Sequence, residues 1–196
     1  MQLGFIVDLR KCLGCHACEA ACAAENCLGG GLSFRRVAAV EYADDGELET
    51  AYLSIACNHC ADPECFRVCP NGTYRKRRDG VVLHDARLCS GCGKCVRACP
   101  YKAPVFDPAT GRVDKCQLCA NHADRSRAPA CVEACPVGAL RLVDLDAARL
   151  DGTVKTVRGF PDIRLTRPST RFYPRSGKVA SLGRGAAPEE ARHNDS

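Results

Sequence analysis

Apolar residues occur along this chain only in short runs, each bounded by a turn or by closely spaced cysteines. The runs at residues 4–7, 81–84 and 139–143 predict short strands. Residues 73–77 are a further candidate strand, which a turn at Arg-Asp-Gly, residues 78–80, joins to the strand at 81–84. Short strands of this kind favour an α+β fold built around small hairpins.

One helix is expected to continue beyond the first cluster of cysteines, as far as about Asn26. Three consecutive glycines at residues 29–31 end it. Residues 32–56, with an apolar stretch at 52–56, are predicted to form an insertion. Residues 151–196 combine prolines, scattered basic residues and little periodicity, and we expect an extended basic arm there, disordered beyond about Lys178.

The composition leaves little apolar material for a core. Of the 196 residues, 46% are hydrophobic when the 17 cysteines are included, and there is no tryptophan. Without cysteine the apolar share falls to about 37%, which is thin for one compact unit or two small ones. Metal binding must therefore supply much of the free energy of folding.

The cysteines are not scattered, because 16 of the 17 fall into four groups of four. The groups are Cys12, Cys15, Cys18 and Cys22; Cys57, Cys60, Cys65 and Cys69; Cys89, Cys92, Cys95 and Cys99; and Cys116, Cys119, Cys131 and Cys135. A proline follows the last cysteine of the second, third and fourth groups. Such spacing binds [4Fe–4S] clusters in bacterial-type ferredoxins, where the fourth cysteine of a group ligates the other cluster of a pair. Four groups predict four clusters and an electron relay.

Two other uses of cysteine are alternatives to iron–sulfur binding. Structural zinc sites take two close pairs of ligands with a longer spacer between them, and three cysteines within seven residues fit that pattern poorly. Disulfides are the usual alternative in cysteine-rich chains, but cysteines three apart in compact loops are badly placed to bridge, and 17 is an odd number. A radical S-adenosylmethionine enzyme would require a C-x3-C-x2-C site, which is absent from the sequence.

The first and third groups belong to an internal repeat. Residues 8–15 (DLRKCLGC) align with residues 85–92 (DARLCSGC), and the second and fourth groups share a looser likeness. Each half thus carries one compact and one expanded group, which predicts an α+β fold of two ferredoxin-like modules. We place residues 1–31 with 100–150 in one module and residues 57–99 in the other, with 32–56 as the insertion and 151–196 as the arm.

The formal charge of +5 is no sign of nucleic-acid binding. Sixteen thiolates add about −16 and four oxidised cluster cores add about +8, so the loaded chain is near −3. No stretch approaches the ~18–20 apolar residues of a membrane span. We expect no secretory signal of its own and synthesis in the cytoplasm.

Four stretches carry a resemblance to a known family: residues 32–36 (LSFRR), 53–60 (LSIACNHC), 99–104 (CPYKAP) and 115–116 (KC). Over about residues 3–175 the chain resembles the iron–sulfur electron-transfer subunit of dimethyl sulfoxide reductase and related molybdopterin oxidoreductases. The resemblance implies a catalytic partner with a molybdenum (or tungsten) bis-pterin cofactor and a membrane anchor subunit that exchanges electrons with quinone. It also implies a peripheral, membrane-associated complex, which can be exported in folded form with its catalytic subunit.

The resemblance further implies that ligands cross between groups, first with fourth and second with third. Carried over by position, the sets are Cys12, Cys15, Cys18 and Cys135 for cluster 1; Cys22, Cys116, Cys119 and Cys131 for cluster 2; Cys57, Cys60, Cys65 and Cys99 for cluster 3; and Cys69, Cys89, Cys92 and Cys95 for cluster 4. By analogy the module of clusters 1 and 2 faces the catalytic subunit. The module of clusters 3 and 4 faces the quinone side.

Some residues outside the ligand sets are candidates for contact with a cluster. His59, between two ligands, could donate a hydrogen bond to cluster sulfur, and an ordinary packing role is the alternative. Lys11, Lys94 and Lys115 border ligand loops and could stabilise reduced clusters, or else be ordinary solvated lysines. Cys27 is expected to be a buried thiol. A soluble poly-ferredoxin that shuttles between dissociable enzymes is the alternative function; in either case the chain alone should catalyse nothing.

Overall fold

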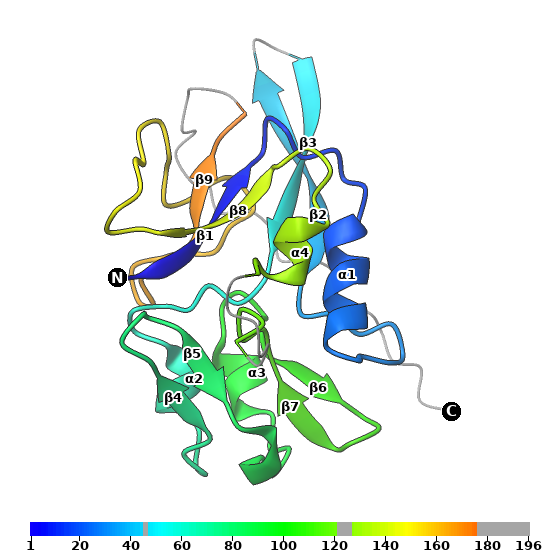
Figure 1. Ribbon diagram of the computed structural model, residues 1–196, viewed down its shortest axis with the longest axis vertical. Helices are drawn as coiled ribbons and strands as arrows, with labels where there is room; N and C mark the ends of the chain where they lie inside the picture. Colours follow the sequence, from blue (N-terminus) through cyan, green and yellow to red (C-terminus); the bar gives the residue numbers. More distant parts are fainter. Residues whose placement is uncertain (45–46, 121–126, 176–196) are drawn as a thin grey trace.

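The computed structural model describes residues 1–44, 47–120 and 127–175. Its element order is strand-helix followed by a series of hairpins and very short helices, which gives a mixed α+β architecture (Figure 1). Within the described residues, no helix has the length and apolar character that crossing a bilayer requires. The mixture of helices and small sheets confirms the predicted α+β class.

A three-stranded sheet joins the two ends of the described chain. Strand β1 (Leu3–Asp8) pairs antiparallel with β8 (Leu140–Asp144) and parallel with β9 (Arg171–Tyr173). Five of the six residues of β1 are buried. The strands predicted at residues 4–7 and 139–143 are confirmed, whereas β9 lies in the segment predicted to be an extended arm.

A long hairpin occupies the predicted insertion. Strands β2 (Arg36–Asp44) and β3 (Glu47–Ile55) pair antiparallel, with Arg36 opposite Ile55. Ala51 and Leu53 of β3 are fully buried, whereas much of β2 is exposed. Beside this hairpin, helix α1 (Ala17–Glu25) packs against α4 (Ala130–Glu133), so the first and last cysteine groups lie together (Figure 1).

The remaining elements gather at the other end of the molecule (Figure 1). They are the hairpin of β4 (Tyr74–Lys76) and β5 (Val82–His84), helix α2 (Glu64–Arg67), the 3-10 turn η1 (Ala86–Leu88), helix α3 (Lys94–Ala98) and the hairpin of β6 (Val105–Asp107) and β7 (Arg112–Asp114). The strands predicted at 73–77 and 81–84 are confirmed with shorter bounds. Val113 of β7 packs with Cys65, Tyr74 and Cys95, so the hairpin at 105–114 lies with residues 57–99 instead of with the first module, where its sequence position had put it.

Residues 151–175 run along the surface of both regions and are anchored to each. Phe172 of β9 is fully buried and meets Phe160 edge to face, with ring centroids 4.8 Å apart. Farther back, Arg167 forms an ion pair with Asp62, and Nη2 of Arg167 lies 3.0 Å from Oδ1 of Asp62. This described part of the arm is therefore integral to the fold, and the disorder predicted beyond about Lys178 lies outside the described residues.

Candidate metal centres

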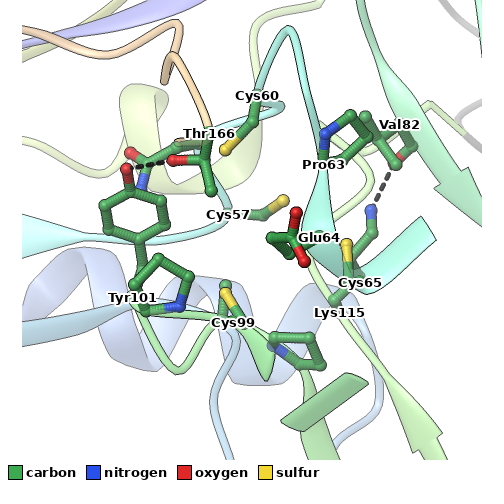
Figure 2. A pocket seen from close by; sticks show the side chains of 14 residues that line it. Cys57, Cys60, Pro63, Glu64, Cys65, Val82, Cys99, Tyr101, Lys115 and Thr166 are labelled. Carbon is green, nitrogen blue, oxygen red and sulfur yellow. Dashed lines mark hydrogen bonds between the residues drawn. The ribbon is translucent and has the colours of Figure 1, made fainter. Parts of the chain in front are cut away.

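All 17 cysteines lie in the described residues, and all are free thiols. Three pockets are each lined by four of them, three from one sequence group and the fourth from a distant one. The lining sets are Cys57, Cys60, Cys65 and Cys99; Cys12, Cys15, Cys18 and Cys135; and Cys69, Cys89, Cys92 and Cys95. Figure 2 shows the ligand set of cluster 3, with the thiols of Cys57, Cys60, Cys65 and Cys99 turned towards a common space.

The other four ligand cysteines meet where α1 packs on α4. Cys22 lies in α1 and Cys131 in α4. Burial raises the pKa of the Cys22, Cys116 and Cys119 thiols, and the nearby Cys131 raises each of them further. Cys131 therefore lies near the other three thiols of this predicted set, while Cys57 of the neighbouring set acts on Cys116 as well.

The ligand loops of the repeat share an unusual backbone. Gly14 and Gly91 have φ angles of 68° and 71°, a region that favours glycine. A Cβ at Gly14 would lie 2.5 Å from the Tyr52 ring, and one at Gly91 would lie 2.1 Å from the Gly111 carbonyl oxygen. The glycine of each C-x-G-C run is therefore required both by its backbone conformation and by the lack of space for a side chain.

Deep burial shapes the acid–base behaviour of the thiols. It raises the pKa of Cys60 to about 12, and it also raises those of Cys65 and Cys116. Such thiols stay protonated at neutral pH until a metal displaces the proton, and binding then couples to folding. Four thiolates facing one space are the donor set of a [4Fe–4S] cluster, so the residues fit that cofactor.

A single zinc ion is a poorer fit to this arrangement. Among the described residues no three His, Cys, Asp or Glu side chains converge closely enough to hold one metal ion. The thiols are instead spread around pockets, as ligands of a cluster with several irons must be.

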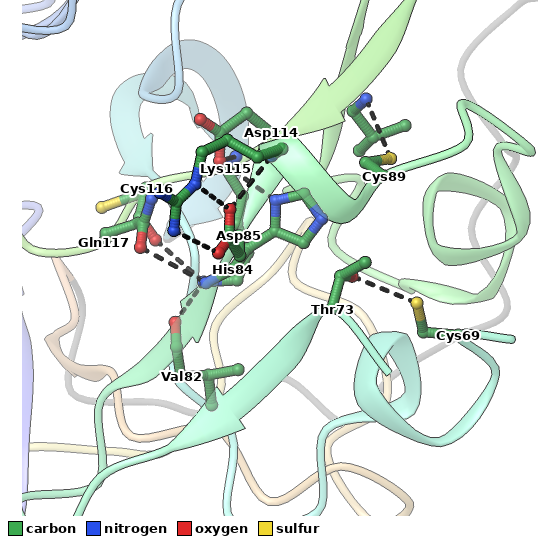
Figure 3. A network of polar contacts seen from close by, with 12 residues as sticks. Cys69, Thr73, Val82, His84, Asp85, Cys89, Asp114, Lys115, Cys116 and Gln117 are labelled. Atoms are coloured by element: carbon green, nitrogen blue, oxygen red, sulfur yellow. Dashed lines mark hydrogen bonds and ion pairs between the residues drawn. The ribbon is translucent and has the colours of Figure 1, made fainter. Parts of the chain in front are cut away.

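Hydrogen bonds reach two of the sulfurs in the ligand set of cluster 4 (Figure 3). The Thr73 hydroxyl lies 3.1 Å from Sγ of Cys69. Although burial alone would raise it, the pKa of Cys69 is lowered by hydrogen bonds from the Thr73 hydroxyl and from backbone N–H groups. Sγ of Cys89 accepts from the backbone N–H groups of Gly91, at 3.4 Å, and Val113, at 3.5 Å. Donors to thiolate sulfur raise the potential of iron–sulfur clusters.

His59 and Lys115, two of the candidates for contact with a cluster, are both buried. Nδ1 of His59 accepts the backbone N–H of Val82 at 3.0 Å, which places the proton of the neutral ring on Nε2. Burial lowers the pKa of His59, and Lys115 and Lys76 lower it further. Nε2 makes no hydrogen bond among the described residues, so it is available to donate to a cluster.

Lys115 is also completely buried. Its ammonium group donates to the carbonyl oxygens of Val82 and, at 3.1 Å, of Cys116 (Figures 2 and 3). Its charge acts on the Cys65 thiol. Lys11 and Lys94 are exposed, although Lys94 lines the pocket of the fourth set.

Sequence reasoning was wrong about Cys27 and overlooked several polar residues. Cys27 is exposed, because α1 ends at Glu25 and Cys27 lies in a turn with φ 50° before the glycine run. Arg35 and Ser54, both buried, lie between two ligand sets. Their only sequence signal was that they fall in two of the stretches shared with the family.

Comparison with known proteins agrees with this geometry. Residues 48–145 match the family described as the 4Fe-4S dicluster domain. A probable anaerobic dimethyl sulfoxide reductase chain of Escherichia coli K12, YnfG, is 38% identical over 96% of this chain and 98% of its own length. A chain of the anaerobic dimethyl sulfoxide reductase from the same organism is 39% identical over 88% of this chain and 89% of its own.

Subunits of other reductases also match. A tetrathionate reductase subunit of Archaeoglobus fulgidus is 47% identical over 64% of this chain and 58% of its own length. The thiosulfate reductase relative from Salmonella typhi is an electron transfer subunit, so the similarity is to redox carriers and not to catalytic chains. The chain is an iron–sulfur protein that belongs to the electron-transfer subunits of the dimethyl sulfoxide reductase family.

Proposed function

We propose that this chain relays electrons through four [4Fe–4S] clusters between a quinone-linked membrane anchor subunit and a catalytic subunit that carries a molybdenum (or tungsten) bis-pterin cofactor. The clusters are those assigned above, with ligand sets 1 to 4. Each cluster supplies reversible one-electron chemistry when bound. The chain holds the clusters, excludes water from the inner ones and donates hydrogen bonds to their sulfurs.

The exposure of the cysteines is the observation that carries this proposal. One ligand of set 1, Cys15, and one of set 4, Cys92, are exposed, whereas all four of set 3 are buried. In set 2 only Cys119 is even partly exposed. A relay needs two accessible ends and a protected middle, and this distribution supplies both.

Each proposed end of the relay carries exposed apolar side chains. Leu13 is 62% and Val137 37% exposed beside set 1, and Leu88 is 59% and Phe106 43% exposed beside set 4. Large apolar side chains next to a polar rim are typical of protein interfaces. From the resemblance to the family, we assign the catalytic subunit to the end at Leu13 and the anchor subunit to the end at Leu88. The complex would associate peripherally with the membrane.

Charge substitutions at the two ends test these assignments. We expect Leu13→Asp to release the catalytic subunit while the anchor subunit remains bound, and Leu88→Asp to do the reverse, because each buries a charge in one interface only. The measurement is affinity purification of the tagged chain from anaerobically grown cells, with the bound subunits identified. Leu165→Asp, at an exposed leucine of the arm, is the matched control. Loss of both partners from both variants would contradict the assignment.

The same purification separates the relay subunit from a soluble poly-ferredoxin. A stable complex predicts stoichiometric recovery of a large molybdenum- or tungsten-containing protein with the unsubstituted chain. Recovery of the loaded chain alone, still able to exchange electrons with free redox proteins, would favour the soluble carrier instead. Co-purification of a membrane subunit and of quinone with the chain tests the anchor assignment. The side of the membrane on which the complex is found tests export in folded form with the catalytic subunit.

A further inference from the structure

Arg35 is a charged side chain in an unexpected place. It immediately precedes β2, and only 1% of it is exposed. Its guanidinium group lies over the ring of Phe5 in β1, 4.4 Å from the ring centroid. Among the described residues no carboxylate forms an ion pair with it, so the compensating charge must come from another kind of group.

One side of the guanidinium group faces set 1. Nη1 donates to the Ser54 hydroxyl at 3.1 Å, and that hydroxyl lies 3.5 Å from Sγ of Cys18. Because the Ser54 oxygen accepts from Arg35, its own hydrogen is free to point at the Cys18 sulfur. Ser54 thereby links the cation to a ligand of cluster 1.

The thiols of set 2 also act on Arg35. Burial opposes the charge on Arg35, but Cys131, Cys116 and Cys18 offset this, and the net effect is a raised pKa. Nε and Nη2 make no hydrogen bond of normal geometry among the described residues, although they are fully enclosed. Buried donors without partners are rare in native proteins, and the groups that act most strongly on Arg35 are the ligand thiols of Cys131 and Cys116.

We propose that Arg35 is a buried cation shared by clusters 1 and 2, and that it raises the reduction potentials of both. This inference rests on the ligand sets proposed above. A reduced cluster is one unit more negative than an oxidised one, so a fixed positive charge in a protected interior favours the reduced state. Because Arg35 is linked to set 1 through Ser54 and interacts electrostatically with Cys131 and Cys116 of set 2, it acts on these two clusters and leaves clusters 3 and 4 nearly unaffected.

The test is a reductive titration of the purified, loaded full-length chain, followed by electron paramagnetic resonance. In Arg35→Gln we expect the reduction equilibrium of two clusters to become at least about tenfold less favourable, which is about 59 mV for a one-electron couple. The two that move should be those altered by Cys18→Ser and Cys131→Ser. Arg35→Lys keeps the charge, so the two clusters should retain most of the reduction potential that they have in the unsubstituted chain.

Arg36→Gln is the matched control, since it removes the same charge one residue along. Arg36 is exposed and donates to the carbonyl oxygens of Tyr101 and Lys102, so clusters 1 and 2 should keep their potentials. Equal shifts in Arg36→Gln and Arg35→Gln would overturn the proposal. So would a shift of all four clusters together in Arg35→Gln.

Ser54→Ala keeps the question open to test if Arg35→Gln does not fold. It removes one hydroxyl, and we expect it to lower the potential of cluster 1 alone. Unmoved potentials in a loaded Arg35→Gln, or in Ser54→Ala where Arg35→Gln does not fold, overturn the role of Arg35 and leave the relay intact. Fewer than four titrating clusters in the unsubstituted chain would instead contradict the relay itself.

Discussion

At the scale of single residues, the fold buries positive charge beside groups that become more negative on reduction. Lys115 is fully enclosed and fixed by two carbonyl oxygens, one from β5 and one from a ligand residue, Cys116. His59 lies close by, neutral and with an unpaired Nε2 among the described residues. Both were candidates from sequence because they adjoin ligand cysteines. Their burial distinguishes them from Lys11 and Lys94.

Replacing Lys115 should have two effects. Lys115→Met leaves the Val82 and Cys116 carbonyl oxygens without their donor, which should cost about 1–3 kcal/mol of stability. It also removes a cation near Cys65, so the potential of cluster 3 should fall. Redox titration and the rate of cluster loss in denaturant measure the two effects. Lys94→Met, at an exposed lysine, should change neither by much; equal effects in both variants would contradict the role of burial.

The ligand assignment itself is tested by comparing two cysteines. Cys60→Ser should lose at least one iron or a whole cluster, because Cys60 is a buried member of set 3. Cys27→Ser should keep the full iron content, since Cys27 is exposed and outside every set. Iron and sulfide analysis of the purified chains decides this. Iron loss from Cys27→Ser would show that the sets are incomplete.

At the scale of elements, strands with clear apolar runs beside ligand loops were predictable, and exposed or very short strands were not. Strands β1, β5 and β8 have clear apolar runs, and α1 continues because Ala23 replaces the proline of the other groups. The β2–β3 hairpin was missed because β2 is largely exposed and lacks a clean alternation. Strand β9 is three residues long and is held by pairing with β1 and by a bridge between Val154 and Phe172.

The arm gives a prediction at this scale. Phe172→Ala should destabilise the loaded chain by about 3–5 kcal/mol, as expected for loss of a fully buried phenylalanine. The readout is the half-life of the visible iron–sulfur absorbance in guanidinium. Arg164→Ala removes an exposed ion pair with Asp162 in the same arm and should change the half-life little. Equal half-lives for both variants would mean that β9 does not support the cluster-bearing body.

At the scale of the whole molecule, cofactor and fold support one another. The apolar core is small and includes ligand cysteines among its buried members, such as Cys57, Cys116 and Cys131. Removing the clusters should therefore unfold much of the chain. The cysteine spacing and the family resemblance together predicted the three groups of four cysteines that line common pockets. The role of Arg35 needed the three-dimensional structure, because Arg35 reaches the ligands through Ser54 only when β2 and β3 pair.

The most direct test of the relay is the metal content of the anaerobically purified chain. Four cubanes predict about 16 iron and about 16 acid-labile sulfide per polypeptide, together with four one-electron reduction steps. About eight iron with two steps would contradict a four-cluster relay, and bound zinc in place of iron would contradict the assignment of the sites.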